Sequence, residues 1–103
     1  MIIELNDEFY ALAKTVDFSY MGEHIKFDDE HNRIVLDECD IERKDYYGES
    51  YYMTAIGCFL DCITTEIDMT GLSDDQNEVL PRGRQLYALH DGIYYSLPVK
   101  EGE

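Results

Sequence analysis

Three cysteines and three histidines are the residues of this chain best suited to metal binding or nucleophilic chemistry. Cys58 and Cys62 stand four residues apart, so on a helix they would share one face. A zinc site would need two more ligands, such as Cys39 and a histidine, and the short Cys-x-x-Cys knuckle is absent. Because free cysteine is among the most buried residue types, we predict core packing, no bound metal and no cofactor.

Two other chemical signals fail on inspection. Residues 66–71 begin like a calcium loop, but Asn77 occupies the twelfth position, where a bidentate glutamate is needed. We interpret this segment as a helix end stopped by Gly71. The sequence has no Gly-x-Ser-x-Gly elbow and no glycine-rich phosphate loop. We therefore expect a protein that is not an enzyme, with a small metal-dependent or hydrolytic enzyme as the alternative.

The charge balance excludes a class of partners. The 103 residues contain 8 Lys and Arg against 23 Asp and Glu, a formal net charge of −15. Phosphate contacts require basic residues, so we predict no direct binding to DNA, RNA or an anionic membrane. A hydrophobic fraction of 45% nevertheless predicts a folded core.

Acids and tyrosines gather in the middle of the sequence. Such a surface can pair with Arg and Lys and also stack against them. We predict a partner-binding surface made of Asp28, Asp29, Glu30, Asp37, Glu38, Asp40, Glu42, Asp45, Glu49, Tyr46, Tyr47 and Tyr51. The alternatives are a solvated face that only keeps the protein soluble, with Tyr52 in the core, and halophilic adaptation.

The elements that must position these residues predict an α+β fold. Residues 6–16 have a helix cap at Asn6 and apolar residues at helical spacing. Residues 18–27 and 33–37 are strand-like and are joined by turn formers. Residues 38–50 are the least regular, with one or two helical turns before Gly48.

The second half predicts one main helix over residues 51–69, capped by Ser50, with a core-facing stripe from Tyr52 to Ile67. A capping box at Ser73 predicts a short helix before Pro81. Residues 86–90 and 93–99 flank Asp91-Gly92 and predict a hairpin, with Pro98 at an edge. We expect one domain, residues 1–103, with an antiparallel sheet of about four strands in two hairpins, packed by the main helix and the N-terminal helix.

The N-terminal residues have no basic region and no long apolar stretch, so we expect no signal peptide and a cytoplasmic location. For a phage-encoded protein this would be the host cytoplasm. A tyrosine-rich edge of the C-terminal hairpin (Tyr87, Tyr94, Tyr95) would allow pairing with a second copy as a homodimer.

Tyr46-Tyr47-Gly48-Glu49 and Asp61-Cys62-Ile63-Thr64 resemble the ribonuclease-inhibiting segment of the barstar family. In that family the first run opens a helix and the second lies further along it. This resemblance implies an immunity protein that blocks a toxin nuclease.

As a small, strongly acidic domain without catalytic motifs, the chain is also similar to phage-encoded anti-defence inhibitors, the anti-CRISPR and DNA-mimic class. That resemblance implies a non-enzymatic inhibitor bound to the basic nucleic-acid-binding surface of a nuclease or defence complex. The remaining alternative is a self-associating structural or regulatory module.

Overall fold

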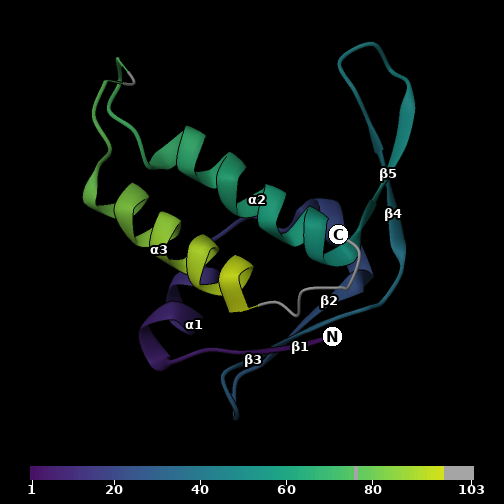
Figure 1. The fold of residues 1–103 in the computed structure, drawn as a ribbon, viewed down its shortest axis with the longest axis horizontal. Helices are drawn as coiled ribbons and strands as arrows, with labels where there is room; N and C mark the ends of the chain where they lie inside the picture. The colour runs from purple at the N-terminus through teal and green to yellow at the C-terminus, as the bar shows by residue number, and fades with distance from the viewer. Residues whose placement is uncertain (76, 97–103) are drawn as a thin grey trace.

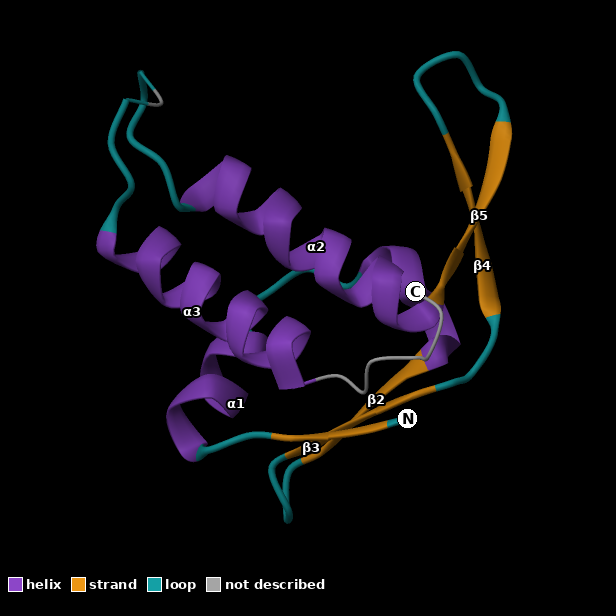
Figure 2. Ribbon diagram, viewed as in Figure 1, coloured by secondary structure: helices purple, strands orange, loops and turns teal. Residues whose placement is uncertain are grey.

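The computed structural model describes residues 1–75 and 77–96 and shows an α+β fold with five strands in two antiparallel sheets. The elements in chain order are β1 (Ile2–Glu4), α1 (Asp7–Ala13), the 3₁₀-helix η1 (Ser19–His24), β2 (Ile25–Asp28), β3 (Arg33–Leu36), β4 (Asp40–Lys44), β5 (Ser50–Thr54), α2 (Ala55–Thr70) and α3 (Pro81–Ser96). One sheet has the order β1-β3-β2, and the other is the β4–β5 hairpin, whose turn extends away from the helices (Figures 1 and 2). The α+β prediction is confirmed.

The N-terminal helix begins as the sequence predicts. Asn6 caps α1 by accepting a hydrogen bond from the Phe9 amide at 2.8 Å. The helix ends at Ala13, earlier than the predicted Val16, and Val16 is buried in the turn that follows. Before α1, the short strand β1 pairs with β3, a strand that the sequence analysis did not identify.

The first predicted hairpin is confirmed as β2 and β3, with Phe27 opposite Ile34. The first strand is shorter than predicted, because residues 19–24 form η1 instead of extended chain. Gly22 breaks that segment with a φ of 55°, a conformation that favours glycine, and this bend buries Met21 completely.

The helical turns predicted within residues 38–50 are wrong, because this segment forms β4 and the turn of a second hairpin. The main helix consequently starts at Ala55, not at Tyr51, and its cap is Thr54, whose hydroxyl accepts the Gly57 amide at 3.1 Å. Residues 51–54 are aromatic, branched or flexible types that suit a strand, and Ile41 pairs with Met53 across the ladder. The stripe of the main helix is otherwise confirmed by the buried side chains of Phe59, Ile63 and Ile67.

The predicted C-terminal hairpin is wrong, because residues 81–96 form the helix α3. Leu86, Leu89 and Ile93 follow helical spacings of three and four residues, and all three are buried in the main core. This stripe overrides the turn preference of Asp91-Gly92. Residues 97–99, including Pro98, lie outside the described residues.

The predicted helix before Pro81 is also wrong within the described residues. Ser73 and Asp75 instead shape a turn, closed by an isolated bridge between Leu72 and Val79. The side-chain oxygen of Ser73 accepts the Glu78 amide at 3.1 Å, so this serine caps a turn and not a helix.

Helices α2 and α3 approach each other through two glycines. A Cβ atom built on Gly83 would overlap the carbonyl oxygen of Gly71, whereas one built on Gly92 would meet nothing within 4 Å. We therefore expect Gly83→Ala to lower the free energy of unfolding by roughly 1–3 kcal/mol, through forced separation of the helices. Gly92→Ala, in the same helix, should raise it by about 0.5–1 kcal/mol, because alanine favours helix. Urea denaturation measures both, and equal changes would contradict this packing.

The sulfur side chains fit the core prediction. Cys58 and Cys62 are buried beside Phe59 and Ile63, and Cys39 is half-buried.

Among residues 1–75 and 77–96, no helix has the length and apolarity needed to span a bilayer.

Candidate functional site

The structure separates the twelve predicted partner-binding residues into two groups. Asp28, Asp29 and Glu30 lie at the β2–β3 turn. The other nine lie in residues 37–54, which comprise the link after β3 and the β4–β5 hairpin, and which we name the acidic ribbon. The two hairpin turns point to opposite ends of the molecule (Figure 1), so one flat partner surface cannot cover both.

The β2–β3 turn uses its carboxylates internally. Asp28 Oδ2 lies 2.9 Å from His31 Nδ1, and Asp29 Oδ1 accepts from Lys14 Nζ at 2.7 Å and from the Tyr10 hydroxyl at 2.6 Å. The hydrogen bond from His31 lowers the pKa of Asp28, and that from Lys14 lowers the pKa of Asp29. Asp29 holds the turn against α1, and Asp28 stabilises the turn itself, so both are poorly placed to receive a partner.

The hydrogen bond between Tyr10 and Asp29 can be tested through the stability of the protein at high pH. Burial, and then its hydrogen bond to Asp29, raise the pKa of Tyr10 to about 12 from its usual 10.0. Since the folded state favours the neutral phenol, this contribution to stability is complete below about pH 10 and is lost as the pH rises toward about 12. We expect urea midpoints of the wild type to fall more steeply across this window than those of Tyr10→Phe. Parallel curves would contradict the contact.

The acidic ribbon presents its carboxylates outward. Along β4, Ile41 and Arg43 face the body, whereas Asp40, Glu42 and Lys44 alternate with them on the exposed side. The residues opposite Glu42 and Asp40 on β5 are Tyr52 and Thr54, respectively. The ribbon has six acidic residues and two basic ones, Arg43 and Lys44.

Arg43 is turned away from that surface. Its Nη1 donates to Asp61 Oδ2 on α2 at 3.0 Å and lies 3.6 Å from Cys58 Sγ. The guanidinium also stands 4.5 Å from the ring centroid of Tyr20, and the side chain is only 15% exposed. The hairpin is therefore anchored by one of its two cations, which leaves Lys44 as the basic side chain on its outer face.

The turn of the hairpin displays tyrosines. Asp45 Oδ1 accepts the amides of Tyr47 and Glu49 at 2.8 and 2.9 Å, and Gly48 takes a φ of 82°. The rings of Tyr46 and Tyr47 are 96% and 86% exposed and contact each other edge to face. Asp45 thus shapes the turn, while these two rings are available to a partner.

Two other tyrosines differ from the sequence analysis. Tyr52 was assigned to the core stripe but is 67% exposed on the outer face, because it belongs to β5 and not to α2. Tyr51 lies on the face that carries Arg43 and is 40% exposed. The strand-favouring types at residues 51–54, two tyrosines and a threonine, are the sequence signal that would have placed Tyr52 on a strand.

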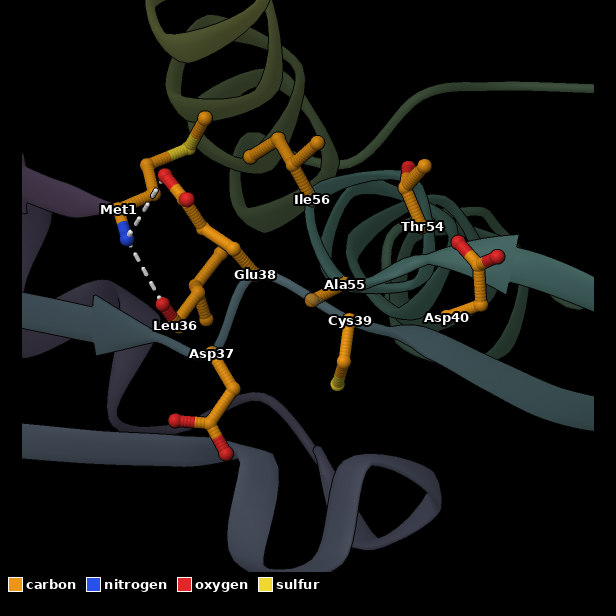
Figure 3. A pocket seen from close by; sticks show the side chains of 9 residues that line it. All are labelled: Met1, Leu36, Asp37, Glu38, Cys39, Asp40, Thr54, Ala55 and Ile56. Carbon is orange, nitrogen blue, oxygen red and sulfur yellow. Dashed lines mark hydrogen bonds and ion pairs between the residues drawn. The ribbon is translucent and has the colours of Figure 1, made fainter.

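A cavity of about 490 Å³ opens where the acidic ribbon crosses the start of α2. Asp37, Glu38 and Asp40 line it together with apolar side chains (Figure 3). Those apolar residues include Leu36, Cys39, Ala55 and Ile56. The Met1 ammonium also lines the cavity and lies 3.8 Å from Glu38 Oε1, so this carboxylate already faces one cation. The apolar lining suits the stem of a Lys or Arg side chain, and the acids around it suit its charged end. The sequence did not predict this cavity, since it depends on a long-range crossing.

The cysteines and acids show no metal centre in the part of the chain that is described, where no three His, Cys, Asp or Glu side chains are grouped to hold an ion. Burial, followed by the neighbouring Cys58, raises the pKa of the Cys62 thiol to about 12, so this thiol stays protonated near neutral pH.

Comparisons of the chain with family models, with curated proteins and with solved structures found no match in any of the three. The barstar-like run Tyr46–Glu49 does not open a helix, as the resemblance implied, but forms the β4–β5 turn. Its second run, Asp61–Thr64, does lie on a helix, α2.

Proposed function

We propose that this protein is a non-enzymatic inhibitor that places the carboxylates of the acidic ribbon in the nucleic-acid-binding groove of a nuclease. The observation that carries the proposal is the orientation of Arg43, which removes a cation from a surface already rich in acids. Among the described residues, Asp40 and Glu49 have no ion pair. Glu38 is 84% exposed and has a long ion pair, at 3.8 Å, with the N-terminal ammonium of Met1. Asp37, Glu42 and Asp45 each have a partner within the fold, but their side chains remain on exposed residues.

The spacing of these carboxylates suits a groove built for phosphates. Asp40 and Glu42 stand two residues apart on the same face of β4, and two residues of an extended strand span about 6.8 Å. One DNA strand carries a phosphate for every ~3.4 Å of its axis. A basic groove would therefore meet negative charges at about half the linear density of one DNA strand.

The exposed tyrosines and the cavity add stacking and shape recognition to the attraction between charges. Tyr46, Tyr47 and Tyr52 offer exposed rings on which Arg side chains stack, and the cavity receives the end of one Lys or Arg. The partners that fit this chemistry are an RNA-guided nuclease, a restriction enzyme or a toxin nuclease. In the last case the protein would act as an immunity protein.

The predicted self-association through a C-terminal edge strand loses its basis, because residues 81–96 form a helix. Tyr87, Tyr94 and Tyr95 are exposed, but they stand on the helix α3 and offer no unpaired backbone.

A panel of purified nucleases tests the proposal. We expect immobilised protein to capture at least one of three basic nucleases (guide-loaded, restriction or toxin type), to inhibit its cleavage, and to do so more strongly at ~50 mM than at ~300 mM salt. In gel shifts at ~50 mM salt the protein itself should bind neither DNA nor RNA. A clear shift, or inhibition that is insensitive to salt, would contradict the proposal.

A further inference from the structure

Cys39 differs from the other two cysteines in its surroundings. Its side chain lines the cavity of about 490 Å³, whereas Cys58 and Cys62 are 0% and 4% exposed in the core. The Cys39 carbonyl accepts the Ala55 amide at 3.0 Å, which fixes the residue at the joint between the acidic ribbon and α2. The cavity therefore gives a small molecule access to one thiol of the three.

A histidine stands beside this thiol. Sγ of Cys39 lies 3.3 Å from Nδ1 of His24 at the end of η1, and Asp37 Oδ2 lies 3.2 Å from the same nitrogen. A proton that leaves Sγ can therefore pass to Nδ1, where the carboxylate of Asp37 also accepts a hydrogen bond from it. Cysteine, histidine and carboxylate come from η1 and the link after β3, 13 to 15 residues apart in sequence.

We propose that Cys39 is a thiol-modification site that reacts with small cationic disulfides. The thiolate of Cys39 attacks one sulfur of the disulfide, a new S–S bond forms, and the old S–S bond breaks. The departing thiolate carries the electron pair away and takes the proton held by His24. The disulfide is the oxidant, so the exchange needs no other reagent.

The preference for a cation follows from the charges that face the thiol. His24 reaches it from η1, Asp37 and Glu38 from the link, and Asp40 from β4. The N-terminal ammonium of Met1 also lines the cavity and lies 3.8 Å from Glu38 Oε1. Because the three carboxylates outnumber this ammonium, the cavity repels an anionic reagent and attracts a cationic one. An aminoethyl adduct would place its ammonium among these carboxylates in the cavity.

The test uses cystamine, a dicationic disulfide, and the dianionic disulfide DTNB as probes on the reduced protein at pH 7.5. We expect cystamine to modify Cys39 and to leave Cys58 and Cys62 unmodified, as located by peptide mass spectrometry. Relative to the rates of free cysteine, Cys39 should favour cystamine over DTNB by at least about tenfold, and ~0.5 M salt should remove most of this preference.

Two matched variants separate His24 from a general effect of charge or fold. His24→Gln should slow the cystamine reaction by at least about tenfold while Tm is retained. His31→Gln, which removes another histidine paired with an aspartate, should leave the rate unchanged. Equal reaction of all three cysteines, faster reaction with DTNB, or an unchanged rate in His24→Gln would overturn the proposal. The comparison of reagents on the wild type needs no variant, so it decides even if His24→Gln fails to fold.

Discussion

Reversing Glu38, Asp40 and Glu42 to Lys should weaken binding to a nuclease captured from the panel by about 10²–10⁴-fold, the largest effect we expect from any small set of substitutions. Each lost charge pair costs on the order of 1–3 kcal/mol when it is partly desolvated, and about 1.4 kcal/mol corresponds to a factor of ten. The loss should be greatest at low salt and should include the association rate. Because the three side chains are exposed, Tm should change little.

The matched control reverses three exposed acids that lie outside the acidic ribbon, Glu8, Asp68 and Asp74, and so changes the net charge by the same amount. We expect this variant to bind within about tenfold of the wild type. Equal losses in the two variants would show a dependence on total charge and would remove the acidic ribbon as the site. Unchanged binding in both, with aggregation of the less charged protein, would favour the solubility interpretation.

Arg43→Ala should have the second-largest effect, a loss of about 2–4 kcal/mol in the free energy of unfolding. The substitution removes the ion pair with Asp61, the contact with the Tyr20 ring and the apolar stem that packs behind the hairpin. A two-stranded hairpin is marginal by itself, so amide exchange in residues 40–54 should rise more than in the three-stranded sheet.

Lys44→Ala provides the control, since Lys44 is the next residue, faces outward and has no ion pair among the described residues. It should change the free energy of unfolding by no more than about 0.5 kcal/mol. Equal effects of the two substitutions would mean that Arg43 does not anchor the hairpin.

The parts of the fold with local signals were predictable from sequence. The capping residue Asn6 predicts the start of α1, and the turn-forming residues after Phe27 predict the first hairpin. The predicted hairpin at Asp91-Gly92 is wrong because burial of the helical stripe Leu86, Leu89 and Ile93 outweighs the local turn preference of two residues. A tertiary contact, the close approach of Gly83 to Gly71, completes that helix pair and has no local sequence signature.

The candidate site was predictable in its composition but not in its arrangement. The density of acids between Asp28 and Glu49 identifies the segment. However, this segment contains two separate hairpin turns, β2–β3 and β4–β5, which face away from each other (Figure 1). A count of charges treats Arg43 as a cation that offsets the charge of the neighbouring acids. In the structure its partner is Asp61, 18 residues away on α2, and this ion pair turns Arg43 inward. Alternation within residues 40–44, if weighed as a strand, would have placed Arg43 on the face of Ile41.

The most direct test of the central claim, that the acidic ribbon is a recognition surface for basic partners, is an NMR titration of the isotopically labelled protein with a nona-arginine peptide at low salt. We expect chemical-shift changes concentrated in residues 37–52, with the tyrosine rings of Tyr46, Tyr47 and Tyr52 shifted as well. The β2–β3 turn should stay largely unperturbed, because Asp28 and Asp29 are held by His31 and Lys14. Shifts spread evenly over all acidic residues, or concentrated on the β2–β3 turn, would contradict this claim.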